Sequence, residues 1–276
     1  MLSMNIERDT LPSDEEIAEE PAVIVAAHPD DEVIGLGTRL SHFEQLRAIV
    51  HITDGAPRNG SDIRNAGKDT WQQYADVRRA EMAAALEEAR CKASQTPCFW
   101  CPDQRAVNRI ASHARRLASL FERLQTRHVF THPYEGGHPD HDAVAASVNC
   151  AATLMQDRGS RPPLVLEFAS YHASPSGVES ECFLNHAGVP LRNRELNEEQ
   201  RMMKQRLFRC YRSQQNTLAW FPIQNEPIRL APLYDFSSPP HEGQLLYETF
   251  DWGFTSVKWC RLAAAALRKF SDGLSS

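Results

Sequence analysis

Short runs of β-branched and other apolar residues alternate along this chain with segments long enough to form helices. The runs predict strands at residues 22–27, 47–53, 98–101, 128–132 and 164–171. The segments between them predict helices at residues 33–46, 70–90, 105–125 and 141–157, with a loop at 54–69. Strands that alternate with helices of this length are typical of a parallel sheet covered by helices on both faces. We therefore predict an α/β fold with a mostly parallel, doubly wound sheet.

The two ends of the chain have a different character. Residues 1–20 contain seven acidic residues and one arginine, a net charge of −6 that equals the formal charge of the whole chain, so we expect a mobile acidic tail there. After a core at 21–194, residues 195–276 begin with a charged helix at 195–213 and end with a helix at 255–271. Prolines and aromatic residues crowd the stretch between these helices, which predicts a small C-terminal lobe packed on the core, or a wall for stacking sugars.

Composition excludes several classes of protein. The chain beyond residue 20 is close to neutral, so we expect neither nucleic acid nor an acidic membrane as a partner. It has no apolar run of roughly 18 residues that could span a membrane and no secretory signal, so we expect a cytoplasmic protein. Seven scattered cysteines do not form a disulfide framework, and Cys98 and Cys101 lack the second pair that a four-sulfur zinc site needs.

An acidic cluster follows the first predicted strand, in the sequence Ala27-His28-Pro29-Asp30-Asp31-Glu32. Two adjacent carboxylates beside a buried strand repel each other and lose solvation unless a cation neutralises them. A divalent metal is the usual solution. The glycines Gly35 and Gly37 come after the acids, so the order of a dinucleotide-binding loop is absent.

A second polar cluster, His138-Pro139-Asp140-His141, follows the strand predicted at 128–132. Both clusters therefore lie where a strand passes into a helix. In an open parallel sheet, ligands bind outside the carboxyl ends of the strands, where the winding order reverses. We expect the two clusters to meet there and to form a metal site.

The motifs AHPDDE (27–32) and HPDHDAV (138–144) resemble those of the PIG-L/LmbE family of zinc-dependent N-acetylglucosaminyl deacetylases. Weaker similarity includes Thr53-Asp54-Gly55, Arg78-Arg79-Ala80-Glu81, Lys204 and Tyr211-Arg212-Ser213-Gln214, so that it covers roughly residues 22 to 215. The resemblance implies a Rossmann-like fold with its active site at the two motif loops.

The resemblance also implies a role for each motif residue. His28, Asp31 and His141 would bind zinc, or ferrous iron in the cell, and leave the fourth position open for water. Asp30 would be the general base. His138 would stabilise the oxyanion or protonate the leaving amine, and Asp140 would orient His138 by a hydrogen bond.

Two further residues are candidates for binding substrate. Arg78 is similar to a family arginine that contacts substrate oxygens, although an exposed helix arginine paired with Glu81 is an alternative. Some family members have an aromatic residue just before the second motif, where this chain has Gly136 and Gly137. Tyr134 supplies the nearest hydroxyl, and it is either part of the site or a structural tyrosine. Glu32 suits the first turn of a helix as well as it suits a catalytic role.

The expected function is that of a zinc-dependent hydrolase that removes an acetyl group from an N-acetylated amino sugar, a small-molecule substrate of the N-acetylglucosamine type. One alternative is a metal-dependent amidase for another small-molecule amide, such as an antibiotic intermediate. Another is a metal-containing binding protein without turnover, although such a protein would need neither Asp30 nor His138. The oligomeric state is left open, and a homo-oligomer remains an option.

Overall fold

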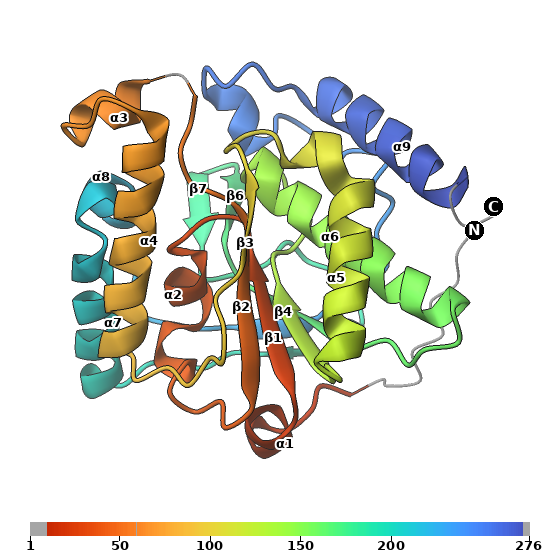
Figure 1. The fold of residues 1–276 in the computed structure, drawn as a ribbon, viewed down its shortest axis with the longest axis horizontal. Coiled ribbons are helices and arrows are strands. Elements are labelled where there is room, and N and C mark those ends of the chain that lie inside the picture. Colours follow the sequence, from red (N-terminus) through yellow and green to blue (C-terminus); the bar gives the residue numbers. More distant parts are fainter. Residues whose placement is uncertain (1–9, 59, 273–276) are drawn as a thin grey trace.

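The apolar runs form a parallel sheet in the computed structural model of the protein, which describes residues 10–58 and 60–272. Five strands pair in parallel in the order β3-β2-β1-β4-β5 (Figure 1). They are β1 (Ala22–Ala26), β2 (Leu46–Thr53), β3 (Cys98–Cys101), β4 (His128–Thr131) and β5 (Leu164–Phe168). The sheet continues beyond β5 with the antiparallel strands β9 (Ile228–Leu230) and β8 (Leu191–Arg192). The predicted α/β class and mostly parallel sheet are confirmed.

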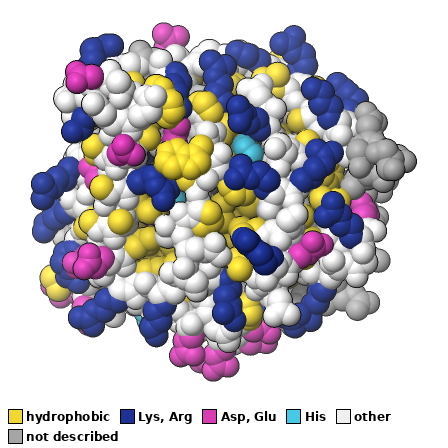
Figure 2. Space-filling model, viewed as in Figure 1, with side chains coloured by type: hydrophobic (Ala, Val, Ile, Leu, Met, Phe, Trp, Pro, Cys, Tyr) yellow, Lys and Arg dark blue, Asp and Glu magenta, His cyan; other side chains and the backbone are white. Residues whose placement is uncertain are grey.

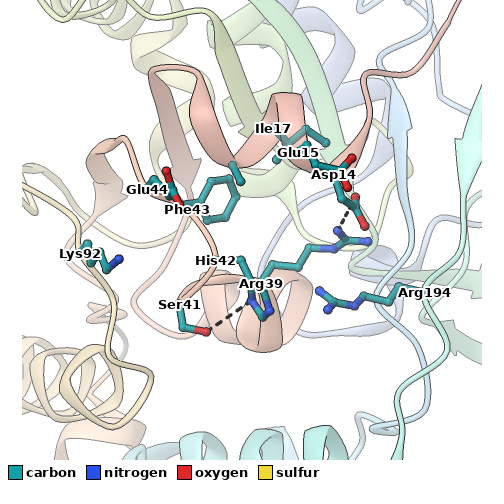
Figure 3. A pocket seen from close by; sticks show the side chains of 11 residues that line it. Asp14, Glu15, Ile17, Arg39, Ser41, His42, Phe43, Glu44, Lys92 and Arg194 are labelled. Carbon is teal, nitrogen blue, oxygen red and sulfur yellow. Dashed lines mark hydrogen bonds and ion pairs between the residues drawn. The ribbon is translucent and has the colours of Figure 1, made fainter.

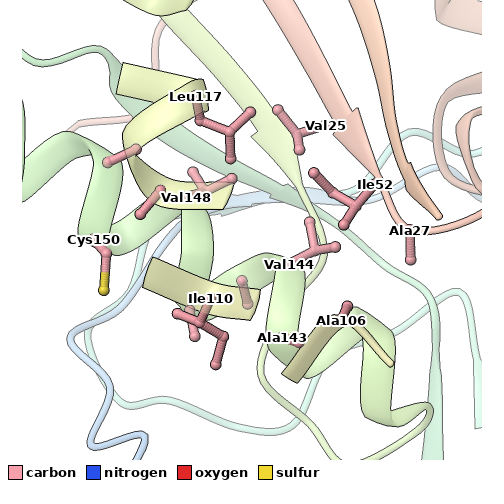
Figure 4. Close-up of a cluster of buried hydrophobic side chains, with 14 of the residues drawn as sticks. Val25, Ala27, Ile52, Ala106, Ile110, Leu117, Ala143, Val144, Val148 and Cys150 are labelled. Carbon is pink, nitrogen blue, oxygen red and sulfur yellow. The ribbon is translucent and has the colours of Figure 1, made fainter. Parts of the chain in front are cut away.

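Helices cover both faces of this sheet. The first face carries α2 (Asp31–Leu36), α4 (Trp71–Glu88) and α7 (Glu198–Cys210), and the second carries α5 (Ile110–Arg123), α6 (Pro139–Asp157) and α9 (Ser256–Asp272). Side chains alternate along a strand, so Ile24 of β1 packs on the first face while Val23 and Val25 pack on the second. Figure 4 shows Val25 and Ile52 of the sheet beside Leu117 of α5 and Val144 of α6.

The winding order reverses between β1 and β4. These strands are neighbours, but α2 follows β1 onto one face and α6 follows β4 onto the other. The two connecting loops therefore open a crevice at the carboxyl ends of the strands. They are the loops that carry the two sequence motifs.

Several predicted elements are shorter than expected. The helix predicted at 33–46 ends at Leu36 and continues only as a 3₁₀ turn at Gly37–Arg39, because Thr38 donates its N–H and hydroxyl to Glu226 at 2.9 and 2.6 Å. The strand predicted at 164–171 ends at Phe168. The chain then forms a separate hairpin of β6 (Tyr171–Ser174) and β7 (Gly177–Ser180), and the predicted loop at 54–69 contains α3 (Ser61–Asn65).

The two ends of the chain contribute further elements to the fold. Within the stretch expected to be an acidic tail, Asp14–Glu19 form α1 with a capping box between Ser13 and Glu16. Residues 1–9 lie outside the described residues. In the C-terminal part, β9 lies within the main sheet and α8 (Gln215–Leu218) follows α7. The sheet thus crosses the boundary expected at residue 194.

The surface has mixed character. Figure 2, in the view of Figure 1, shows basic side chains spread over one face with apolar side chains between them. Beside α1, at the amino ends of the strands, a cavity of about 390 Å³ contains Arg39, which donates to Asp14 at 3.0 Å, while Arg194 points into the same space (Figure 3). All seven cysteines are free. Within residues 10–58 and 60–272, no helix combines the length and apolarity needed to cross a membrane.

Candidate active site

The predicted ligand residues meet at the crevice between β1 and β4. Nδ1 of His28 lies 3.4 Å from Oδ2 of Asp31, and Oδ1 of Asp31 lies 3.2 Å from Nε2 of His141. All three side chains are buried, and they line a cavity of about 300 Å³ together with Asp30 and His138. The two motifs, more than 100 residues apart in sequence, thus supply opposite walls of one site.

The loop from β1 to α2 has a strained backbone at Asp30. This residue has φ 134°, a conformation that residues other than glycine rarely adopt. Asp31 begins α2, and its Oδ2 accepts the backbone N–H of His28 at 2.7 Å. These contacts turn the carboxylates of Asp30 and Asp31 into the cavity instead of toward solvent.

The loop from β4 to α6 holds His138 at the start of the helix. Nδ1 of His138 accepts the backbone N–H of Asp140 at 3.1 Å, so the neutral ring carries its proton on Nε2. Asp142 braces the same loop by accepting the N–H groups of Glu135 and Gly136 at 3.2 and 3.1 Å. A Cβ atom at Gly137 would lie 1.9 Å from the carbonyl oxygen of Tyr171, so only glycine fits there.

The carboxylate of Asp140 lies in the same cluster as His138, but its hydrogen bonds go to other partners. Its carboxylate accepts the backbone N–H groups of Gln104 and Ala106 at 2.5 and 2.9 Å, and Oδ2 lies 3.4 Å from Nε2 of His28. Its hydrogen bond to the ring of His138 is donated by the backbone N–H. Asp140 therefore orients the His28 ring and anchors the loop after β3.

Sequence reasoning missed two residues at the site. Oδ1 of Asp103, in the loop after β3, lies 3.6 Å from Nε2 of His28 and 3.9 Å from Nε2 of His138. Nε2 of His132, directly after β4, lies 3.2 Å from Oδ2 of Asp31, and its ring stacks on that of His141 at 3.9 Å. Both follow the ends of strands. The rule that ligands bind outside the carboxyl ends of parallel strands therefore points to them as well.

Arg78 and Tyr134 have opposite placements. Arg78 is buried and lines the cavity, where it donates to Asp30 at 2.9 Å and also to the carbonyl oxygen of Pro29, so the exposed alternative is wrong. Tyr134 lies in the core, donates its hydroxyl to the carbonyl oxygen of Ser238 at 2.8 Å, and does not line the cavity. The aromatic residues at the cavity are instead Tyr171, Phe221 and Trp252.

Glu32 does not face the cavity either. It is fully buried, and its carboxylate lies 3.0 Å from Nε2 of His51 and accepts the hydroxyl of Tyr211. Its Oε2 also accepts the backbone N–H of Asp30 at 3.2 Å. Glu32 thus supports the strained Asp30 loop from behind and links Tyr211, in the C-terminal part, to the site.

The charges in the site call for a cation. Burial opposes ionisation of Asp31, but the rings of His141 and His132 hold its pKa well below its usual range. Burial likewise opposes ionisation of Asp103, yet His28 and His138 lower its pKa to about 2. The same carboxylates overcome burial at His28 and raise the pKa of its imidazole well above the ordinary value. A ring held cationic by several carboxylates marks the place that a bound metal would take.

The remaining groups favour their uncharged forms. Burial raises the pKa of Asp30 to about 8, against the opposing charge of Arg78. Burial, with the neighbouring His28, lowers the pKa of His138 to about 3. The site therefore offers donor groups suited to a divalent metal, since the ligand atoms of His28, His138 and His141, and likewise those of Asp31, His132 and His141, lie within 4.8 Å of one another. The Asp30 carboxylate, held by Arg78, faces the same cavity.

Comparisons with known proteins agree with this architecture. A family model described as PIG-L, GlcNAc-PI de-N-acetylase, matches residues 23–152. Among solved structures, the A40926 pseudoaglycone deacetylase Dbv21 has 17% identity and a TM-score of 0.56, over 76% of this chain and 96% of its own. The N,N'-diacetylchitobiose deacetylase from Pyrococcus horikoshii has 17% identity and a TM-score of 0.50, over 80% and 87% of the two chains.

The fold also occurs with another activity. GalB, the 4-carboxy-2-hydroxymuconate hydratase from Pseudomonas putida KT2440, has 17% identity and a TM-score of 0.52, over 78% of this chain and 98% of its own. The search of curated proteins by sequence found no match. At these identities the structures show a shared fold, while the family match covers both motif loops and the strands that carry them. Residues 23–152 of the chain therefore match the PIG-L family model.

Proposed function

We propose that this protein is a metal-dependent hydrolase that removes the acetyl group from an N-acetylated amino sugar. The observation that carries the proposal is the meeting of His28, Asp31 and His141 beside Asp30 in one buried cavity, within the residues that match the PIG-L family model. The deacetylases of the same fold support amide hydrolysis. A protein that only binds metal would not need the additional carboxylate and imidazole at the cavity.

His28, Asp31 and His141 would hold the metal, and we propose zinc, with ferrous iron as the alternative. When bound, the metal would lower the pKa of a water molecule and polarise the amide carbonyl. Two nitrogen donors and one oxygen donor leave room for both water and substrate. Asp140 orients His28 for this role, since Oδ2 lies 3.4 Å from Nε2 of the ring.

Asp30 would accept the proton of the attacking water and later deliver it to the leaving amine. Its carboxylate faces the cavity, and burial raises its pKa toward the range in which a base works at neutral pH. Arg78 holds the carboxylate in place at 2.9 Å. We therefore assign Arg78 a role in orienting Asp30 rather than a primary role in binding substrate.

His138 would stabilise the oxyanion as a neutral hydrogen-bond donor. Its Nδ1 is occupied by the backbone N–H of Asp140, which leaves the proton on Nε2, the atom that faces Asp103 and the cavity. A pKa lowered to about 3 keeps the ring uncharged. A neutral imidazole can donate this hydrogen bond without first being protonated.

The aromatic residues beside the cavity favour a substrate larger than one sugar. The Trp252 ring lies 4.7 Å from that of His138, and Phe250 stacks on Trp252 at 4.4 Å. Trp220 continues the row at 6.3 Å from Phe250 and is 60% exposed. Such a row suits an amino sugar whose neighbouring ring stacks outside the cavity. An amino sugar attached to a larger aglycone is the alternative substrate.

The test is acetate release from a panel of N-acetylated mono- and disaccharides by metal-loaded protein. We expect turnover with at least one of them and a lower KM for disaccharides than for monosaccharides. The Trp252→Ala variant should lose this preference for disaccharides. Asp76→Asn, an exposed carboxylate on α4, serves as the matched control for substitutions of acids in the site. Absence of acetate release from every amide in the panel, with metal bound, would exclude the proposed activity.

A further inference from the structure

A second group of metal-binding side chains lies on the hairpin of β6 and β7. His172 and Glu179 are directly opposite each other in this antiparallel pair, so their side chains share one face. Nε2 of His172 lies 3.9 Å from Oε2 of Glu179. None of the residues on this face lines the active-site cavity, although Tyr171, one residue earlier, does.

An unusual backbone conformation brings Cys182 to the same place. Glu181, just after β7, has φ 56°, which a residue with a side chain rarely adopts. Its carboxylate is anchored by the backbone N–H groups of Gln224 and Asn225, each at 2.9 Å. The chain therefore turns back at Glu181, and Sγ of Cys182 lies 3.9 Å from Oε2 of Glu179. Strain of this kind persists where the surroundings impose it.

The three donor atoms lie somewhat farther apart than the ligand atoms around a bound zinc ion. One ligand atom from each of His172, Glu179 and Cys182 lies within 4.8 Å of the others. Tetrahedral zinc, with bonds of about 2.0 to 2.3 Å, separates its ligand atoms by roughly 3.5 Å. The two distances of 3.9 Å from Glu179, to His172 and to Cys182, would reach that spacing by a contraction of a few tenths of an ångström.

The surroundings of His172 resemble those of a ligand rather than of a core histidine. The ring is 2% exposed, and its Nδ1 lies 3.4 Å from Oε2 of Glu135, yet neither atom has a hydrogen-bond partner. The other oxygen of Glu135 is held by the N–H of Leu184 at 2.7 Å and by Arg229 at 3.0 Å. Metal-bound histidines commonly direct their second ring nitrogen at a carboxylate placed in this way.

We propose that His172, Glu179 and Cys182 bind a divalent metal of the zinc type, with water as the fourth ligand, at a site separate from the active site. A thiolate and a carboxylate carry two negative charges, which match the charge of the ion. Without metal the Cys182 thiol stays protonated, because burial and the charge of Glu179 raise its pKa to about 11, so binding releases a proton. The ion would fix the His172 ring, whose Nδ1 lies 3.4 Å from Oε2 of Glu135, and through this contact it would connect the hairpin to the loop that leads to His138.

Cobalt(II) distinguishes this site from the active site. The ligands assigned to the active site are nitrogen and oxygen atoms, so a thiolate-to-cobalt charge-transfer band in the near ultraviolet can arise only from a cysteine site. We expect the full-length protein to bind about two equivalents of cobalt and to show this band. Cys182→Ser should abolish the band and remove one equivalent, and His172→Gln should weaken both.

Two control variants make the result specific. Cys210→Ser, a half-buried cysteine on α7, should keep the band and both equivalents. His28→Ala should lose the active-site equivalent and acetate release but keep the band, so failure of the proposed activity and failure of this site are distinguishable. A band that survives Cys182→Ser, or a folded wild-type protein that binds cobalt without any band, overturns the proposal.

Discussion

At the scale of single residues, one backbone contact determines what His138 can do. Its Nδ1 accepts the N–H of Asp140, so a donor remains only at Nε2 on the cavity side. The sequence predicts that this histidine is near the metal, but not which nitrogen carries the proton. The tautomer depends on where the first N–H of α6 points, and that follows only from the fold.

The first prediction concerns the general base. Asp30→Asn keeps the volume of the side chain and its contact with Arg78, but removes the carboxylate that accepts the proton. We expect unchanged metal content and a fall in kcat of roughly 10²-fold or more. Elemental analysis and acetate release measure the two effects, with Asp76→Asn as the control. Turnover near that of the wild type would remove Asp30 from the mechanism.

The second prediction concerns His138. Because its proposed hydrogen bond forms in the transition state, His138→Ala should lower kcat and kcat/KM by similar factors, roughly 10²-fold, while the metal content stays level. A neutral donor also predicts that the wild-type rate does not fall as pH rises from 6 to 8, where an imidazolium would be lost. A rate that declines steadily over that interval contradicts the neutral donor.

At the scale of elements, packing between loops decides the geometry of the site. Gly137 lies where the active-site loop passes close to the β6–β7 hairpin, because an added Cβ would come within 1.9 Å of the carbonyl oxygen of Tyr171. The glycine pair 136–137 therefore reflects a close approach of two loops. The sequence left Tyr134 as either part of the site or a structural tyrosine, and its hydroxyl donates to the carbonyl oxygen of Ser238 in the core.

The third prediction tests this contact. Gly137→Ala must push the β6–β7 hairpin away from the α6 loop, since the added Cβ would lie 1.9 Å from a carbonyl oxygen. Overpacking of this kind costs roughly 1–3 kcal/mol of unfolding free energy. We expect a lower melting temperature and a loss of activity larger than the loss of bound metal. An alanine variant with wild-type activity and stability would show that the two loops separate without effect.

The fourth prediction concerns α5 and the pH dependence of stability. His113 is 2% exposed, and burial, with Arg116 and Arg109, lowers its pKa to about 3. In the unfolded chain His113 takes up a proton below its ordinary pKa of 6.5, while in the folded protein it does not. The free energy of unfolding therefore falls as the pH drops from 6.5 toward 3. At pH 5 the loss is about 2 kcal/mol.

Replacing this histidine should therefore flatten part of the pH profile. We expect His113→Phe, which retains an aromatic ring beside Phe99, to lose less stability than the wild type between pH 7 and pH 5. Denaturant unfolding at both values measures the difference. His42→Gln, a substitution at an exposed histidine, should follow the wild type. Parallel profiles for His113→Phe and the wild type would refute the assignment.

At the scale of the whole molecule, the sequence predicts the parts of the fold that local pattern controls. The β-branched run at 22–27 and the run at 128–132 form β1 and β4, and the motifs after them meet as expected. The pattern could not predict β9, because three residues of a proline-rich stretch become a strand only by pairing with β5. The strand-end rule points to Asp103, but its approach to His28 depends on Asp140, which holds the loop after β3 by the N–H groups of Gln104 and Ala106.

The placement of α9 has a consequence for how the protein folds during its synthesis. Trp259 is fully buried, and its indole N–H donates to the carbonyl oxygen of Pro139, the first residue of α6. The first strand and both metal-binding motifs have left the ribosome long before this tryptophan is added. A nascent chain that ends before α9 therefore exposes the flank of its own active-site helix, and this flank is covered only after Trp259 has been added.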